Sequence, residues 1–135
     1  MSKITAFLAT ALVLASASAQ AAPRLSGEAK LAREIEGRVA GEPVRCLPFH
    51  RIHSSRIIDD TAIVYDTGST IYVNRPRAGQ DSLDSWDTLV TRTFGSQLCS
   101  TDVVHLYDAG SRMETGVVFL GEFVPYRKAK GQRAD

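Results

Sequence analysis

Between residues 44 and 124 the sequence consists of short runs rich in β-branched residues, each bounded by turn residues. The runs cover residues 44–47, 55–59, 61–65, 69–74, 88–94, 103–107 and 116–124. Stretches such as Asp59-Asp60 and Asp66-Thr67-Gly68 are typical of tight turns, because aspartate caps a turn and glycine adopts positive φ. This pattern predicts a mainly β fold, a small antiparallel β-barrel or sandwich of six to seven strands.

One short N-terminal helix is expected before these strands. Ser26 is a suitable N-cap, residues 27–36 carry apolar side chains at helical spacing, and Gly37 is a suitable stop. The predicted organisation is a flexible leader over residues 22–28, which overlaps the start of this helix, a single β-rich domain over 29–127 and a disordered tail over 128–135.

The first 21 residues have the three parts of a secretory signal peptide. Lys3 precedes an apolar run over residues 4–15, and a stretch of small residues follows. Ala19 and Ala21 meet the small-residue requirement for cleavage between Ala21 and Ala22, although a cut two residues earlier also fits. The apolar run of 12 residues is too short for a transmembrane anchor, which needs about 20. We therefore predict export to the periplasm.

Composition limits the partners of the exported chain. Removal of the signal peptide leaves 114 of the 135 residues, which is room for one domain. Lys3 leaves with the signal, so 15 basic residues balance 15 acidic ones. Zero net charge argues against nucleic acid as the partner, since nucleic-acid binding needs a basic surface. No second apolar run reaches spanning length, so no transmembrane segment is predicted in the mature chain.

Cys46 and Cys99 are the two cysteines of the sequence. In an exported protein such a pair indicates a disulfide bond. A bond between them would remove unfolded-chain entropy worth about 4 kcal/mol. The alternative is a reactive thiol pair, but the spacing lacks the C-x-x-C pattern of redox catalysts. We predict a structural disulfide.

Five motifs taken as a set carry a resemblance to known proteins. They are GRVAGEPVRC at residues 37–46, SRIID at 55–59, YVN at 72–74, SQLCSTD at 96–102 and LGEFVP at 120–125. With these motifs the chain resembles a family of exported bacterial proteins described as domain of unknown function 6491. The resemblance covers about residues 29–126. It implies export and a small β-rich domain, and it implies no activity, so no catalytic residue is carried over.

The chain departs from this family at two positions. Members commonly have a further cysteine after the position of Asn74 and another before the Leu-Gly pair near the C-terminus. Here those neighbourhoods are Ala78-Gly79-Gln80 and Val117-Val118-Phe119. Loss of both members of one pair is tolerable, whereas loss of one would leave a lone thiol. The resemblance therefore favours pairing of Cys46 with Cys99, the two that remain.

Asp66-Thr67-Gly68 follows an apolar strand, as the catalytic turn of an aspartic peptidase does. Two such aspartates share one proton, so a single copy requires a homodimer. Residues 118–121 (VFLG) resemble the element that supports this turn in small dimeric peptidases. Against this interpretation, Tyr65 is bulkier than the residue usual before the aspartate, and no glycine-rich flap is recognisable. We favour the alternative, an ordinary hairpin turn.

His50 and His53 form an H-x-x-H pair, and His105 lies far downstream. Three imidazoles brought together would make a zinc-like ligand set. The spacing is generic, however, and a polar loop after Pro48 explains His50 and His53 without a metal. A metal site at these histidines is therefore the weaker of the two interpretations.

The remaining candidate residues make no convincing catalytic set. No serine lies in the G-x-S-x-G pattern of hydrolases. Asp59 and Asp60 point apart in a strand turn, and Asp84 and Asp87 fit helix-start caps better than a glycosidic acid–base pair. Trp86 is expected to cover the edge of the core, with ligand stacking as the alternative.

The sequence thus predicts no catalytic residue, no metal and no cofactor. The favoured function is a non-enzymatic periplasmic binding or envelope-associated module; its partner is unknown, with an envelope protein as the candidate. The alternatives are a dimeric aspartic-type peptidase that uses Asp66 and a metal-binding periplasmic protein.

Overall fold

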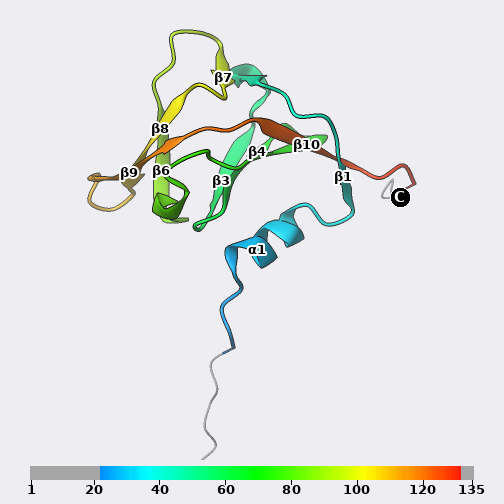
Figure 1. Ribbon diagram of the computed structural model, residues 1–135, viewed down its shortest axis with the longest axis horizontal. Coiled ribbons are helices and arrows are strands. Elements are labelled where there is room, and N and C mark those ends of the chain that lie inside the picture. The colour runs from blue at the N-terminus through cyan, green and yellow to red at the C-terminus, as the bar shows by residue number, and fades with distance from the viewer. Residues whose placement is uncertain (1–21, 132–135) are drawn as a thin grey trace, which may run out of the picture.

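The computed structural model describes residues 22–131 and shows a β-rich domain with an α-helix at one side (Figure 1). The predicted signal peptide and residues 132–135 of the predicted tail lie outside the described residues. The mainly β fold is confirmed. Ten strands form three antiparallel sheets in the described range, more than the six to seven predicted. These sheets do not close into a barrel, so the architecture is sandwich-like.

The largest sheet has five strands. Across the sheet they are β1 (Arg38–Ala40), β10 (Phe123–Lys128), β5 (Thr70–Asn74), β4 (Ala62–Asp66) and β3 (Ser54–Ile58). Every neighbouring pair is antiparallel. The β3–β4 turn contains Asp60 with φ 53°, and the β4–β5 turn contains Gly68 with φ 91°. Both turns lie where the turn residues predict them.

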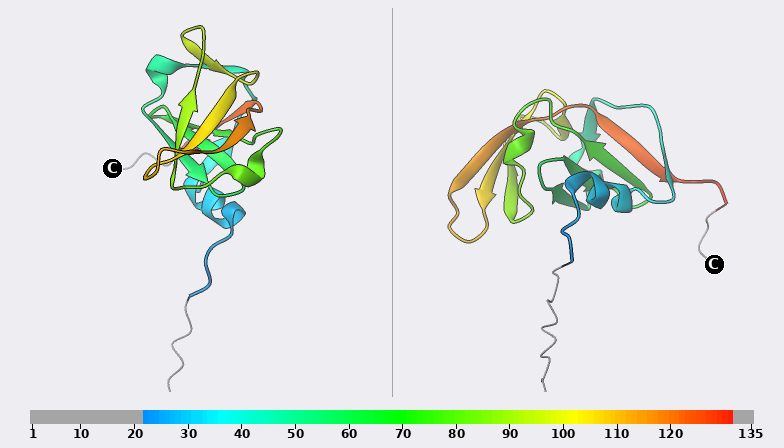
Figure 2. Two further views of the ribbon diagram at one scale, coloured as in Figure 1. Left: turned by 90° about the vertical axis from the view of Figure 1, so that its left-hand side faces the viewer. Right: turned by 60° about the horizontal axis from the view of Figure 1, so that its bottom comes forward.

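Two smaller sheets pack against one face of this sheet. One contains β6 (Asp87–Thr91), β8 (Val103–Asp108) and β9 (Glu114–Phe119), and the other pairs β2 (Cys46–Pro48) with β7 (Gln97–Cys99). The chain passes from β9 directly into β10, as the orange-to-red ribbon in the right panel of Figure 2 shows. One continuous stretch of chain therefore joins the three-stranded sheet to the five-stranded sheet.

Helix α1 (Gly27–Glu34) covers the other face of the five-stranded sheet. Ser26 Oγ accepts a hydrogen bond from the Ala29 N–H at 3.2 Å, which confirms Ser26 as the N-cap. The helix is two residues shorter at its C-terminal end than predicted. Its first two residues fall within the predicted flexible leader, and that part of the leader prediction is wrong. The helix begins at Gly27 because Ser26 caps it, and Glu28 of its first turn also accepts two hydrogen bonds from Arg75, at 2.7 and 2.9 Å.

Two apolar cores lie on opposite faces of the five-stranded sheet. Along β4, Ala62 and Val64 pack toward Leu31 of α1, whereas Ile63 and Tyr65 face the smaller sheets. The core between the sheets is the larger one and includes Leu47, Leu98, Val104, Leu106, Val118, Leu120 and Phe123. Burial on both faces explains why β4 is almost continuously apolar.

The structure divides the single run predicted over residues 116–124. β9 ends at Phe119 and β10 begins at Phe123. Leu120 is fully buried, but residues 120–122 belong to neither strand, and the chain changes sheets between Phe119 and Phe123. Similarly, β6 ends at Thr91, short of the predicted residue 94.

Other differences concern very short elements. The three-residue strands β1 and β7 were not predicted, because they are defined by their partners rather than by a pattern of their own. Two short 3-10 helices were not predicted either: η1 (Phe49–Arg51) follows β2, and η2 (Gln80–Ser82) precedes β6. Lys128, assigned to the tail, is the last residue of β10.

Candidate functional site

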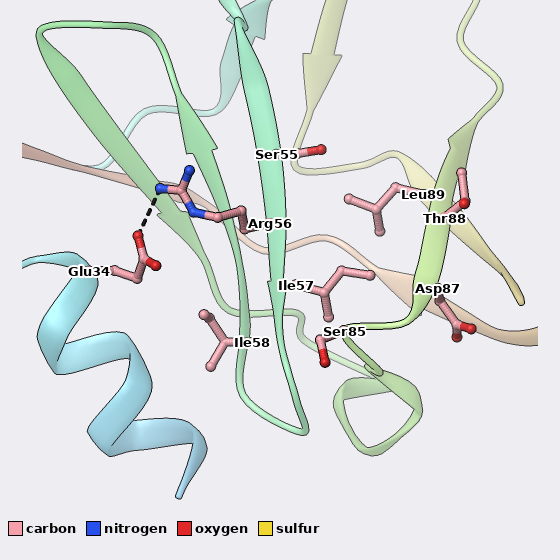
Figure 3. Close-up of a pocket in the computed structure, with 9 residues that line it drawn as sticks. All are labelled: Glu34, Ser55, Arg56, Ile57, Ile58, Ser85, Asp87, Thr88 and Leu89. Carbon is pink, nitrogen blue, oxygen red and sulfur yellow. Dashed lines mark hydrogen bonds and ion pairs between the residues drawn. The ribbon is translucent and has the colours of Figure 1, made fainter. Parts of the chain in front are cut away.

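A groove lies between β3 and β6, the outermost strands of two different sheets (Figure 3). β3 pairs with β4 alone and β6 with β8 alone, so each strand has one edge without a strand partner among residues 22–131. The groove has a volume of about 580 Å³. Ser55 and Ile57 of β3 point toward β6, whereas Arg56, which also lines the groove together with Glu34, points toward α1 (Figure 3).

The floor of the β3–β6 groove is apolar. Ile57 and Leu89 approach from the two facing strands, and both are half-buried against the larger core. Ser55 and Thr88 are exposed above them. Arg56 donates to Glu34 at 2.7 Å and is thereby held on the α1 side of β3. The groove therefore offers two strand edges above a partly apolar floor.

At one end of the groove, hydrogen bonds connect the β3–β4 turn to residues 83–85, the segment that leads into β6. The Asp60 N–H donates to the Leu83 carbonyl oxygen at 3.0 Å, and the Ser85 N–H donates to Asp59 Oδ1 at 2.6 Å. Asp59 also accepts a hydrogen bond from Lys30 of α1. The hydrogen bond from the Lys30 ammonium lowers the pKa of Asp59 by more than partial burial raises it. Together with the bond from the Ser85 N–H, it holds this pKa below its usual value.

Asp66, the candidate peptidase residue, ends β4 and caps the following turn. Its Oδ1 accepts a hydrogen bond from the Gly68 N–H at 2.7 Å, as expected for a hairpin aspartate. Gly121 ends the segment expected to support a peptidase turn, and it is hydrogen-bonded to the Asn74 side chain. Asn74 pairs with Ile63, at the end of the β4–β5 ladder opposite to Asp66. The proposed supporting element is thus at the far end of the ladder from the Asp66 turn.

The three candidate metal ligands are divided between two places. His50 and His53 line one cavity together with Arg51 and Arg127, whose positive charges disfavour a cation. His105 lies in β8, where its Nδ1 is 3.0 Å from a Glu114 oxygen; this bond holds the pKa of Glu114 below its usual value. Over residues 22–131 no three His, Cys, Asp or Glu side chains are grouped closely enough to hold a metal ion.

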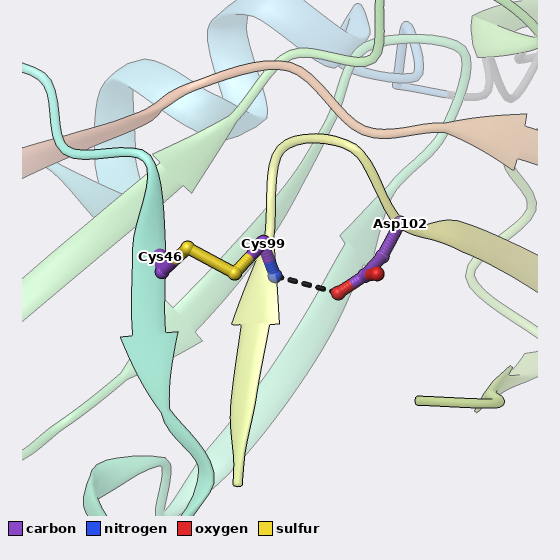
Figure 4. The surroundings of a disulfide bond; sticks show 3 residues. All are labelled: Cys46, Cys99 and Asp102. Atoms are coloured by element: carbon purple, nitrogen blue, oxygen red, sulfur yellow. Dashed lines mark hydrogen bonds between the residues drawn. A yellow bond between two sulfur atoms is a disulfide. The ribbon is translucent and has the colours of Figure 1, made fainter. Parts of the chain in front are cut away.

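The predicted disulfide between Cys46 and Cys99 is confirmed (Figure 4). The two residues are direct partners across β2 and β7, with Cα atoms 4.0 Å apart. Asp102 Oδ2 accepts a hydrogen bond from the Cys99 N–H at 2.7 Å. Because β2 leads directly into η1, the bond also fixes the start of the segment that carries His50.

A third cavity is acidic and borders Trp86. Six aspartates line it: Asp59, Asp60, Asp81, Asp84, Asp87 and Asp108. Asp84 Oδ1 accepts a hydrogen bond from the Trp86 N–H at 2.9 Å, so this aspartate caps a turn rather than a helix. Trp86 is 78 % exposed, and the expectation that it covers the edge of the core is wrong.

Sequence reasoning did not find the groove residues Ser55, Ile57 and Leu89 or the cavity residue Arg127. Each belongs to an ordinary strand pattern, and no local signal marks it. None of the described helices has the length and apolar character needed to cross a membrane. Comparisons of this chain with protein-family models, curated proteins and solved structures find no match.

Proposed function

We propose that this protein is an exported, non-enzymatic binding module of the bacterial periplasm. Its ligand is an extended segment of an envelope protein, which lies as an added strand in the β3–β6 groove. The observation that carries the proposal is the presence of two strand edges, one from each sheet, on opposite sides of one groove.

An extended polypeptide suits this groove chemically. Its backbone presents N–H and carbonyl groups on both sides, so it pairs with the edges of β3 and β6 together. Its side chains alternate, so every second one faces Ile57 and Leu89. Small or medium apolar residues at alternate positions of the ligand complement this floor, and polar residues between them remain in solvent.

Compartment and chemistry agree with this role. The disulfide between Cys46 and Cys99 is of the kind that persists in an oxidising compartment, in keeping with the predicted signal peptide. We also propose that the chain is a member of the exported family described as domain of unknown function 6491. Gly121, the glycine expected to support a peptidase turn, lies at the far end of the β4–β5 ladder from Asp66, which favours binding over peptidase chemistry.

The test of the groove uses two serines that are adjacent in β3. Both are exposed, but only Ser55 lines the groove. Ser55→Tyr places a ring in the groove, and Ser54→Tyr adds the same ring outside it. Random ten-residue peptides displayed on phage are selected against the untagged exported chain, and binding is measured with synthetic versions of the enriched peptides.

We expect enrichment of peptides with alternating apolar residues. Their binding is lost in Ser55→Tyr, retained in Ser54→Tyr and abolished by N-methylation of the peptide backbone, which removes the donors of the added strand. Failure to enrich any peptide, or equal binding to the two tyrosine variants, contradicts the proposal. The export part is tested separately: mass spectrometry of the periplasmic fraction is expected to find the mature chain beginning at Ala22.

A further inference from the structure

A second cavity, about 440 Å³ in volume, shares no lining residue with the β3–β6 groove. Its basic groups come from separate elements: His50 and Arg51 from η1, His53 from the following loop and Arg127 from β10. Hydroxyl-bearing residues of the β4–β5 turn and of β5 complete its wall, among them Ser69 and Tyr72. We call this surface the basic cavity.

The basic cavity contains positive charge without a compensating carboxylate. No Asp or Glu is among its described lining residues. Arg51 and Arg127 form no ion pair with any residue of the 22–131 range. The nearest acid in the turn is Asp66, and its carboxylate accepts the Gly68 N–H instead of facing the cavity. Two guanidinium groups therefore remain available to an anion.

The wall of the basic cavity is held by hydrogen bonds within the fold. The His53 N–H donates to the Asp66 carbonyl oxygen at 2.8 Å, and the Thr67 N–H and Oγ1 donate to the Thr70 carbonyl oxygen at 3.0 and 2.9 Å. Arg127 lies directly opposite Thr70 in the β5–β10 pair. The donors therefore project from a paired sheet and a bonded turn, which limits the entropy lost when a ligand binds.

We propose that the basic cavity binds the phosphate group of a phosphorylated ligand. Arg51 and Arg127 supply forked guanidinium donors, which match phosphate oxygens two at a time. His50, His53, Ser69 and Tyr72 add single donors around the same space. This assignment is independent of the peptide groove, because the two sites use different residues.

The arrangement favours phosphate over a carboxylate. A carboxylate is planar, and one guanidinium fork engages both of its oxygens. A tetrahedral phosphate presents oxygens in several directions, so it benefits from donors on η1, the β4–β5 turn and β10 at the same time. A cation is disfavoured because two arginines border the cavity.

The experiment titrates inorganic phosphate into the untagged exported chain at constant ionic strength and follows amide resonances by NMR. We expect saturable shifts at residues around the cavity, with Arg51→Gln and Arg127→Gln each weakening the binding about tenfold. Arg77→Gln is the matched control, since Arg77 is exposed and outside the cavity, and it is expected to bind as the original chain does. Both cavity arginines are also exposed, so their variants are expected to remain folded.

A second arm identifies the source of the phosphate group. Phosphatidylglycerol vesicles are compared with phosphatidylcholine vesicles by co-sedimentation. Arginine-dependent binding to the anionic vesicles identifies a lipid headgroup, and binding to neither, with phosphate titration intact, identifies a soluble phosphate ester. Absence of saturable phosphate shifts, or equal weakening in Arg77→Gln, overturns the proposal. Ser55→Tyr is expected to leave phosphate binding unchanged, so failure of the groove and failure of this cavity are distinguishable.

Discussion

The side chain of Asn74 holds Gly121 by two hydrogen bonds. Its amide nitrogen donates to the Gly121 carbonyl oxygen at 2.7 Å, and its oxygen accepts from the Gly121 N–H at 3.0 Å. Asn74 is fully buried at the end of β5. Because Gly121 lies between β9 and β10, this pair of bonds fixes the point at which the chain leaves one sheet and enters the other.

Asn74→Asp is expected to lower the free energy of unfolding by about 3 kcal/mol. The carboxylate still accepts from the Gly121 N–H, but it cannot donate to the Gly121 carbonyl oxygen when ionised, and a buried charge is unfavourable. Urea denaturation measures the loss. Gln97→Glu is the control, the same amide-to-acid change at an exposed position, and is expected to change stability by less than about 0.5 kcal/mol. Equal effects at both positions would contradict this role of Asn74.

The disulfide between Cys46 and Cys99 is expected to leave no titratable thiol in the exported chain after non-reducing denaturation. The double variant Cys46→Ala, Cys99→Ala is expected to lose up to about 4 kcal/mol of stability, because the bond closes a long loop in the unfolded chain. Thiol titration and urea denaturation measure the two effects. Two reactive thiols per exported chain would show that the bond does not form.

Asp59 is expected to contribute to the acid sensitivity of the fold. Its pKa is lowered in the folded state, chiefly by Lys30, so the unfolded chain binds a proton more readily. The stabilisation is therefore present above the unfolded pKa of about 4 and is lost as the pH falls through the lower folded value. Lys30→Gln keeps the Ser85 bond to Asp59 and is expected to flatten the fall in urea midpoint between pH 5 and 2. An unchanged pH profile in Lys30→Gln argues against this coupling.

Gly79→Ala is expected to destabilise the fold by about 2 kcal/mol. Gly79 has φ 79°, and a Cβ at this position would lie 2.2 Å from the Val117 carbonyl oxygen. The two segments are held together by backbone hydrogen bonds, because the Phe119 N–H donates to the Ala78 carbonyl oxygen and the Arg77 N–H donates to the Phe119 carbonyl oxygen. Gly95→Ala is the control, because a Cβ there meets no atom within 4 Å. Thermal unfolding of both variants tests the difference, and a Gly79→Ala variant as stable as Gly95→Ala would refute the close contact.

Local chemistry was sufficient to predict much of the fold. Ser26 caps α1, the Asp59-Asp60 and Asp66-Thr67-Gly68 turns lie where predicted, and β4 and β5 match their runs closely. Each of these features depends on residues adjacent in sequence. Where a partner from elsewhere decides the structure, the prediction failed: β7 exists because β2 lies beside it, and the run over residues 116–124 is divided because Asn74 binds Gly121.

The sequence by itself determined the mainly β class, the helix after Ser26 and the disulfide between its only two cysteines, because periodicity, turn chemistry and cysteine count are local properties. Only the tertiary structure decided which side chains meet. It separated His105 from His50 and His53, placed Arg127 beside both of those histidines and set Ile57 opposite Leu89. These relationships depend on how three sheets pack around shared cores, and the free energy of that packing belongs to contacts between residues distant in sequence.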